Sequence, residues 1–317
     1  MTLFRARSDF DATVDAAAAR LGGINAVIVE KDYWVSQVLH VLAEEFPDDF
    51  VFKGGTSLSK CYRLIRRFSE DVDLLILPNG RGTSRIDTLM KDMVARVGES
   101  LGSTPDREGG STGKSRRVRV AYPTGRSEAE GISSGVLLEM GIRGSEQPHE
   151  ILEAGCLLAD AMTQAGQDIR KYDDLRPVRV PVLHPGRTLL EKLAVIHTSL
   201  SGEPGEADCQ KHGRHYYDIH QLLGDDRVRA MLNDRPQVEQ VIASIQDITD
   251  KYFTKPDEHR KLVRPEDGWA SSTAFDASNA YLAEGYTRSM ELLSLDPDGC
   301  PTFADICARV RANRDLL

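Results

Sequence analysis

The sequence predicts an α+β protein in which a mixed N-terminal half is followed by a helical C-terminal half. Short apolar runs with strand character alternate with amphipathic helices in the first 184 residues. From residue 185 onward, apolar residues recur almost entirely at helical spacing. The proline-rich stretch "RPVRVPVLHPG" separates the two patterns. We therefore expect one domain over residues 1–184 and a helical domain over 185–317.

The order of elements follows from the same patterns. Helices are predicted in "SDFDATVDAAAARLG" and in "NAVIVEKDYWVSQVLHVLAEEF", the second capped by Asn25. The next segment, "DFVFKGGTSLSKCYRLIRRFSEDVDLLILP", predicts a strand, a Gly-Gly turn, a short helix and a second strand. A helix in "SRIDTLMKDMVARVGESLG" and strands in "RRVRVAY" and "GVLLEMGI" complete the first half. Between them, the composition of "GSTPDREGGSTGK" predicts a mobile loop.

The C-terminal half predicts further helices. They are expected in "GRTLLEKLAVIHTSL", "RHYYDIHQLLG", "RPQVEQVIASIQDITDKYF" and "AFDASNAYLAEGYTRSMELLSL".

Composition excludes several protein classes. Apolar residues make up 40% and charged residues 28%, a balance typical of globular proteins. The apolar runs are too short to span a bilayer, and no secretory signal is recognisable near Met1. The five cysteines lack the paired spacing of a zinc site, which favours reduced thiols. We expect a cytoplasmic protein without membrane association.

The first chemical signal is a glycine pair before a predicted helix. Gly54 and Gly55 precede Thr56 and Ser57, which begin the helix. Paired glycines let backbone amides approach a ligand closely, and a helix N-terminus favours anions. This arrangement suits the phosphates of a nucleotide, although taken alone it is more often a simple turn.

The second signal is a pair of acids on a predicted strand. Asp71 and Asp73 are two residues apart, so both side chains point to one face, while Val72 and Leu74 face the core. Adjacent carboxylates repel unless a cation neutralises them, and two Mg²⁺ ions would use such a pair for phosphoryl or nucleotidyl transfer. Two exposed acids at a sheet edge are the alternative.

A third metal ligand is expected at Glu139. This acid interrupts the apolar segment "GVLLEMGI", where a buried carboxylate requires a metal or a cation. An ion pair with Arg143 is the alternative.

Basic residues cluster despite a net charge of −9. Nucleic-acid binding depends on a local basic surface and not on the total charge, so the clusters favour RNA, with ordinary solvated faces as the alternative. The expected RNA-binding residues are Arg63, Arg67, Lys114, Arg116 and Arg117, and Arg66 is expected at the nucleotide.

Several separated motifs resemble one family. "EKDYWVSQVL", "FKGGTSLSKCY", "RFSEDVDLLI", "TLLEKLAVIH" and "RHYYDIHQLL" are similar to segments of AbiEii/AbiGii-type nucleotidyltransferase toxins, which include the mycobacterial MenT toxins. The resemblance covers residues 25–223. It implies a polymerase-β-like nucleotidyltransferase core, a mixed sheet with flanking helices, plus the helical C-terminal domain.

The resemblance also implies an activity. Family members belong to toxin–antitoxin and abortive-infection systems, and some transfer NMP from an NTP to the tRNA 3′ end, which blocks translation. It implies two Mg²⁺ ions, an NTP as co-substrate and a cognate antitoxin. It assigns Gly55 and Ser57 to the phosphate loop and Ser69, Asp71 and Asp73 to the metal motif. It assigns Lys192 to the triphosphate and Asp218 to the active site.

Alternatives remain open at each level. Lys192 alone is more often a surface lysine, and Asp218 alone an ion-pair partner of Arg214 four residues earlier. The acceptor is an RNA in the leading hypothesis, and a small molecule or a protein hydroxyl in the second. A catalytically silent, partner-binding protein is the third. The NTP, the tRNA, the antitoxin, the role of the C-terminal helices and the oligomeric state are left open.

Overall fold

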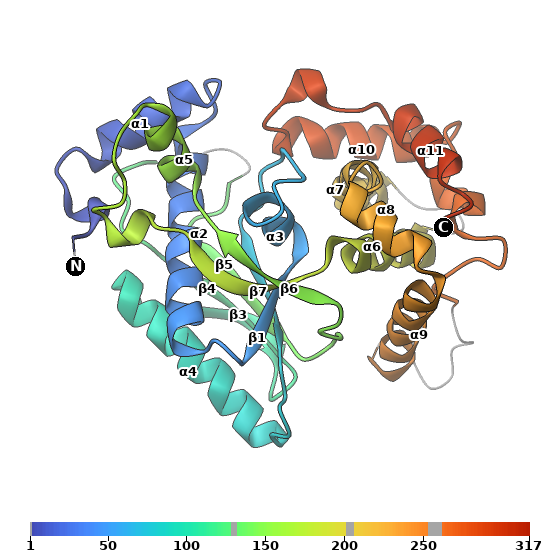
Figure 1. Cartoon of the computed structure of the whole chain (residues 1–317), viewed down its shortest axis with the longest axis horizontal. Helices are drawn as coiled ribbons and strands as arrows, with labels where there is room; N and C mark the ends of the chain where they lie inside the picture. The colour runs from blue at the N-terminus through green and yellow to red at the C-terminus, as the bar shows by residue number, and fades with distance from the viewer. Residues whose placement is uncertain (1, 128–131, 201–205, 253–261) are drawn as a thin grey trace. The chain divides into compact units, whose positions relative to one another are not determined.

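The computed structural model describes residues 2–127, 132–200, 206–252 and 262–317 (Figure 1). The chain divides into two compact units. The first comprises Met1–Cys61, Ser69–Ile142 and His149–Val182, and the second Tyr62–Phe68, Arg143–Pro148 and Leu183–Leu317. The long C-terminal segment of the second unit thus begins at Leu183, two residues before the predicted boundary at 185. It also contains two short segments that we expected in the first domain.

A seven-stranded mixed sheet forms the centre of the first unit. Its strands are β1 Phe50–Lys53, β2 Asp71–Ile76, β3 Asp106–Ser111, β4 Ser115–Val120, β5 Val136–Gly141, β6 His149–Ala154 and β7 Val178–Leu183. The spatial order is β3-β4-β5-β2-β1-β7-β6. β2 pairs parallel with β5 and β1 parallel with β7, whereas β1–β2, β3–β4 and β4–β5 are antiparallel. The predicted α+β class is confirmed.

Five helices accompany this sheet: α1 Phe10–Arg20, α2 Ala26–Glu45, α3 Gly54–Lys60, α4 Thr83–Leu101 and α5 Leu157–Gln164. The Asn25 side chain accepts a hydrogen bond from the Val27 amide and caps α2, as predicted. α2 and α4 lie side by side and contact β5 and β4, respectively (Figure 1). α3 contacts β1 and β2, the strands that precede and follow it in the chain.

Two segments differ from the prediction. The expected mobile loop in residues 102–114 contains β3, which pairs with β4. Most residues of β3 are exposed, so this edge strand has no apolar alternation to reveal it. The proline-rich segment expected as a boundary contains β7, which pairs with β1 inside the sheet. The two units meet in the chain within this strand, between Val182 and Leu183.

The second unit is helical. Its helices are α6 Pro185–Leu200, α7 Glu206–Leu222, α8 Asp226–Asn233, α9 Arg235–Tyr252, α10 Ala280–Leu293 and α11 Phe303–Ala312. α7 packs on α6, α10 and α11, and α8 packs on α6 and α9. α7 and α10 approach closely because Gly213 and Gly285 have no side chain: a Cβ at either position would lie 2.4 Å from an atom of the other helix.

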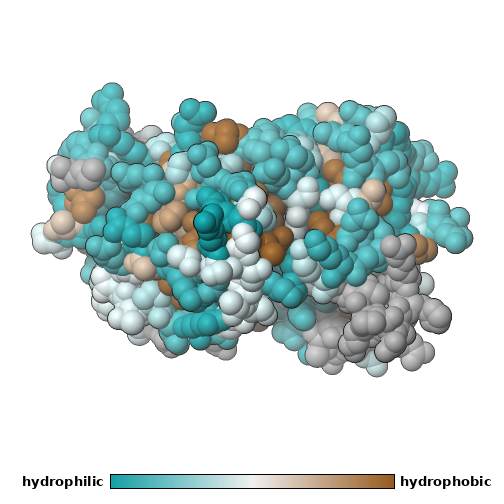
Figure 2. Space-filling model, turned by 90° about the horizontal axis from the view of Figure 1, so that it is seen from below, coloured by the Kyte–Doolittle hydropathy of each residue, from teal (hydrophilic) through white to brown (hydrophobic). Residues whose placement is uncertain are grey.

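No helix among residues 2–127, 132–200, 206–252 and 262–317 is long and apolar enough to cross a membrane. The face shown in Figure 2 is mostly hydrophilic, with hydrophobic residues in separate small areas.

Candidate active site

The glycine turn between β1 and α3 is tied to strand β2. The Thr56 hydroxyl is buried and donates to the Asp71 carbonyl at 2.6 Å, and it lies 2.9 Å from Ser69 Oγ. Ser57 is also buried, and its hydroxyl donates to the Gly54 carbonyl at 2.9 Å. Both hydroxyls therefore hold the turn in place, which leaves its backbone as the part that can approach a phosphate.

Gly54 lies directly against one of the predicted metal ligands. It is the first residue of α3 and has φ +78°, the left-handed region that glycine tolerates best. A Cβ at this position would lie 2.1 Å from Asp73 Oδ2. The glycine turn and the acid pair, inferred separately from the sequence, are thus in contact.

Asp71 and Asp73 lie on one face of β2. Both are partly exposed, whereas Val72 and Leu74 are fully buried, as predicted from the alternation. In the register of the parallel pair, Asp73 is opposite Glu139 of β5. The three predicted metal ligands therefore belong to adjacent strands and to the same face of the sheet.

Glu139 differs from the expectation of a buried acid. Its side chain is 39% exposed, and its Oε1 lies 3.1 Å from Nε of Arg117. Arg117 is its direct neighbour on the antiparallel strand β4. Arg143, the alternative partner considered from the sequence, lies two residues beyond the end of β5. Among the described residues, no three His, Cys, Asp or Glu side chains are arranged to hold a metal ion.

The Glu-Lys-Asp segment of α2 supports this region. Lys31 is fully buried and forms an ion pair with Glu70, the residue before Asp71. Burial lowers the pKa of Lys31, and the hydrogen bond to Glu70 opposes that effect. Asp32 pairs with the buried Lys60 of α3 at 2.6 Å. This segment thus holds both the start of β2 and helix α3.

A second charged cluster lies within the helical unit. Asp218 of α7 is completely buried, and both its oxygens accept hydrogen bonds from Arg67, at 2.7 and 2.8 Å. Its Oδ2 is also 2.8 Å from Nζ of the buried Lys192 on α6. Burial alone would raise the pKa of Asp218, but Arg67 and Lys192 hold it below its usual value. Burial lowers the pKa of Lys192, and Arg67 adds to this while Asp218 opposes it.

The sequence missed two members of this cluster. His215 Nδ1 lies 3.2 Å from Lys192 Nζ, and burial lowers the pKa of His215 well below its ordinary value. We expected Arg67 on an RNA-binding surface, but its side chain is 3% exposed and bound to Asp218. An arginine two residues before the Ser69 motif looks like a surface cation in the sequence, because its partner Asp218 is 151 residues away.

The expected RNA-binding residues divide by exposure. Arg116 is buried and bound to Asp87 of α4 at 3.0 Å, so it is not available to a phosphate and this expectation is wrong. It is buried because alternate residues of β4 face the core. Arg63 and Lys114 are exposed, and Arg117 is half exposed. Arg66, expected at the nucleotide, is 75% exposed and lies 3.1 Å from Asp296.

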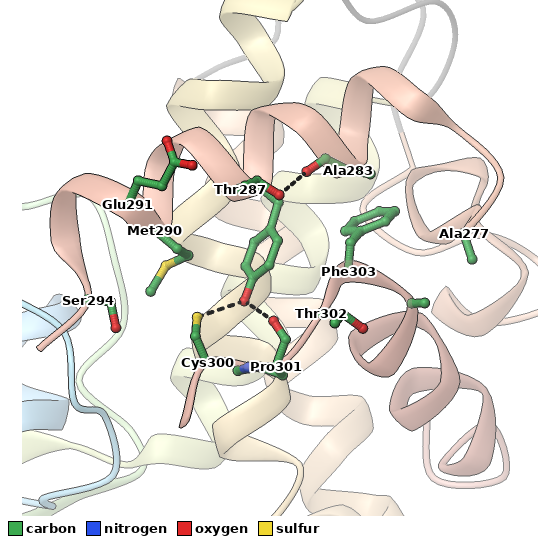
Figure 3. Close-up of a pocket in the computed structure, with 12 residues that line it drawn as sticks. Ala277, Ala283, Thr287, Met290, Glu291, Ser294, Cys300, Pro301, Thr302 and Phe303 are labelled. Atoms are coloured by element: carbon green, nitrogen blue, oxygen red, sulfur yellow. Dashed lines mark hydrogen bonds between the residues drawn. The ribbon is translucent and has the colours of Figure 1, made fainter. Parts of the chain in front are cut away.

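The helical unit also contains a cavity of about 620 Å³ (Figure 3). It lies between α10 and the segment that leads into α11, with Met290 and Phe303 among its walls. Tyr286 OH donates to the Pro301 carbonyl at 2.6 Å and lies 3.3 Å from Cys300 Sγ (Figure 3). The residues predicted for catalysis do not line this cavity.

Comparisons with known proteins give one family. The family model described as nucleotidyl transferase AbiEii toxin, type IV TA system, matches residues 39–308. Among solved structures, the chain is similar to MenT4, a nucleotidyltransferase toxin from Mycobacterium tuberculosis H37Rv, with 21% identity, 96% of each chain covered and a TM-score of 0.49. It is also similar to JHP933 from Helicobacter pylori, with 14% identity, 81% of this chain and 89% of the other covered, and a TM-score of 0.34. Comparison with curated proteins gives no match.

Proposed function

The chain belongs to the AbiEii nucleotidyltransferase toxin family of type IV toxin–antitoxin systems, and we propose that it transfers NMP from an NTP to the 3′ end of tRNA. The observation that carries the proposal is the contact between Gly54 and Asp73, because it joins a phosphate-binding turn to a metal-binding acid. Blocking the tRNA 3′ end in the cytoplasm would stop aminoacylation and hence translation. A cognate antitoxin is expected to restrain this activity.

We propose that Asp71 and Asp73 hold Mg²⁺. Two carboxylates on one face of β2 are the hard oxygen donors that this ion prefers. When bound, Mg²⁺ would neutralise charge at the α-phosphate and activate the acceptor hydroxyl. Glu139, opposite Asp73, is proposed as the third metal ligand. To bind the metal, its carboxylate would have to leave its ion pair with Arg117. A second ion needs this third carboxylate.

Further residues of each unit are proposed to contact the nucleotide. The backbone of Gly54 and Gly55 would contact phosphate oxygens, because the hydroxyls of Thr56 and Ser57 are used inside the fold. Lys192 would donate from its ammonium to the triphosphate. Arg66 is exposed and adds a cation for the nucleotide in this proposal.

The proposed RNA acceptor requires a basic surface on the protein. A protein with net charge −9 needs a restricted basic surface to bind RNA. Lys114, in the turn between β3 and β4, and Arg117, on the exposed face of β4, are suited to this role. Arg63 is a further exposed cation. A small molecule or a protein hydroxyl is the second candidate acceptor, because the core chemistry is the same for each.

The test is an acceptor comparison. Purified protein is incubated with Mg²⁺ and each of the four α-³²P-labelled NTPs, with total tRNA, with a cell lysate depleted of RNA, or with neither. We expect label on tRNA only. Label in the lysate without RNA would favour the second acceptor class, and no label in any reaction would favour a silent protein. Asp71→Asn provides the control without transfer.

A further inference from the structure

Lys192 lies in a buried cluster of charged side chains. Arg67 and Lys192 bring two cations to the single carboxylate of Asp218. All three side chains are at most 9% exposed. Charges in a buried environment interact more strongly than they do in water. An anionic ligand at Lys192 would be attracted to both cations, which suits a triphosphate site.

Asp218 itself is not placed to touch a metal or a substrate. Its side chain has no exposed surface, and its oxygens accept three hydrogen bonds from Arg67 and Lys192. The bidentate geometry with Arg67 fixes the plane of the carboxylate. Arg67 therefore fixes the position of Asp218 Oδ2, and Oδ2 in turn fixes the direction of one N–H bond of the Lys192 ammonium.

His215 sets a second direction from the same ammonium. Its Nδ1 lies 3.2 Å from Lys192 Nζ, and Asp218 Oδ2 lies 2.8 Å from the same atom. Burial keeps this imidazole neutral, so that one ring nitrogen has a lone pair to accept with. An ammonium has three tetrahedral N–H bonds, so two fixed acceptors determine the direction of the third.

Building on the proposed function, we propose that His215 is a positioning residue for Lys192, acting together with the Arg67–Asp218 pair to aim the third N–H at a phosphate oxygen of the nucleotide. Asp218 is then also a positioning residue and not a catalytic one. Arg67, which we expected at RNA, instead serves the lysine together with His215 in this proposal.

The test measures binding of inorganic tripolyphosphate with Mg²⁺ by calorimetry, which isolates the triphosphate contact from base and acceptor. His215→Phe keeps a ring of similar size without an acceptor, and His215→Asn returns an oxygen near the position of Nδ1. We expect about tenfold weaker binding for His215→Phe, from the loss of a hydrogen bond to a charged group. His215→Asn should restore most of the affinity. The matched control is His220→Phe, on the same helix but beside Arg309 of α11; it should bind as the wild type does.

A double-mutant cycle separates positioning from general stability. In a Lys192→Met background, His215→Phe should cause no further loss of affinity, because the group that it positions is absent. Thermal unfolding of each variant confirms that it is folded. Equal loss of affinity in both backgrounds, no loss for His215→Phe, or no rescue by His215→Asn would overturn the positioning role. Wild-type binding without transfer to any acceptor would contradict the proposed function alone, whereas absence of wild-type binding would overturn both.

Discussion

Replacing Gly54 with alanine tests the contact between the glycine turn and the acid pair. Two effects add at this position. An L-residue at φ +78° is strained by roughly 1–2 kcal/mol. The new methyl group would also lie 2.1 Å from Asp73 Oδ2 and 3.1 Å from Asp73 Cβ, and overpacking of this kind costs about 1–3 kcal/mol. We expect the free energy of unfolding to fall by about 2–5 kcal/mol in total.

The chain offers a matched control in Gly80. This glycine also has a left-handed φ, +73°, but a Cβ there would meet no atom within 4 Å. Gly80→Ala therefore carries the backbone strain without the collision, about 1–2 kcal/mol. The difference between the two variants isolates the contact with Asp73.

Activity provides the second measurement. If Asp73 rotates away to relieve the collision, part of the stability returns, but a metal ligand is displaced. A displacement of about 1 Å in an active site lowers the rate by about 10²-fold. Thermal unfolding and labelled-nucleotide transfer are measured on both variants. Gly54→Ala with the stability and the activity of Gly80→Ala would refute the contact and the site built on it.

Four further outcomes are expected. Asp71→Asn should abolish transfer at an unchanged melting temperature; full activity in this variant would remove it from the metal site. Lys192→Met should raise KM for the NTP if the contact between Lys192 and the triphosphate is equally strong in the ground and transition states. It should lower kcat if that contact forms only in the transition state. Unchanged values of both KM and kcat would exclude the contact. Lys114→Ala should weaken tRNA labelling and reduce the slope of log affinity against log salt by about one. Arg116→Ala should instead lower the melting temperature, because this side chain is buried. The reverse pattern would contradict the exposure of these two residues. Burial lowers the pKa of His220 to about 4. Between about pH 6.5 and pH 4, the unfolded state therefore binds a proton at this residue that the native state does not bind. The free energy of unfolding should fall as the pH falls through this window, and His220→Gln should reduce that fall.

Local patterns predicted the parts of the site that depend on neighbouring residues. The alternation of Asp71 and Asp73 with Val72 and Leu74 requires only the geometry of one strand. The cap at Asn25 likewise requires only its own helix. These expectations are confirmed because a period of two and a side-chain cap are properties of short segments.

Pairings between distant segments were beyond such patterns. Arg116 and Arg117 are adjacent in sequence, yet one faces Asp87 in the core and the other faces Glu139 across the sheet. Their opposite faces follow from the alternation along β4, but the partners Asp87 and Glu139 belong to other segments that no local pattern identifies. Arg67 presents the same difficulty, because its burial depends on a carboxylate of α7. β3 remained hidden since an exposed edge strand rich in glycine has no apolar signal.

One experiment tests directly whether the proposed site of Asp71 and Asp73 transfers a nucleotide to the tRNA 3′ end. The direct measurement supplies labelled NTP and Mg²⁺ to wild-type protein and to Asp73→Asn, with intact tRNA and with tRNA whose terminal diol has been oxidised by periodate. We expect label on intact tRNA with wild-type protein, none on oxidised tRNA, and none with Asp73→Asn. Equal labelling of intact and oxidised tRNA, or labelling by Asp73→Asn at the wild-type rate, would contradict it.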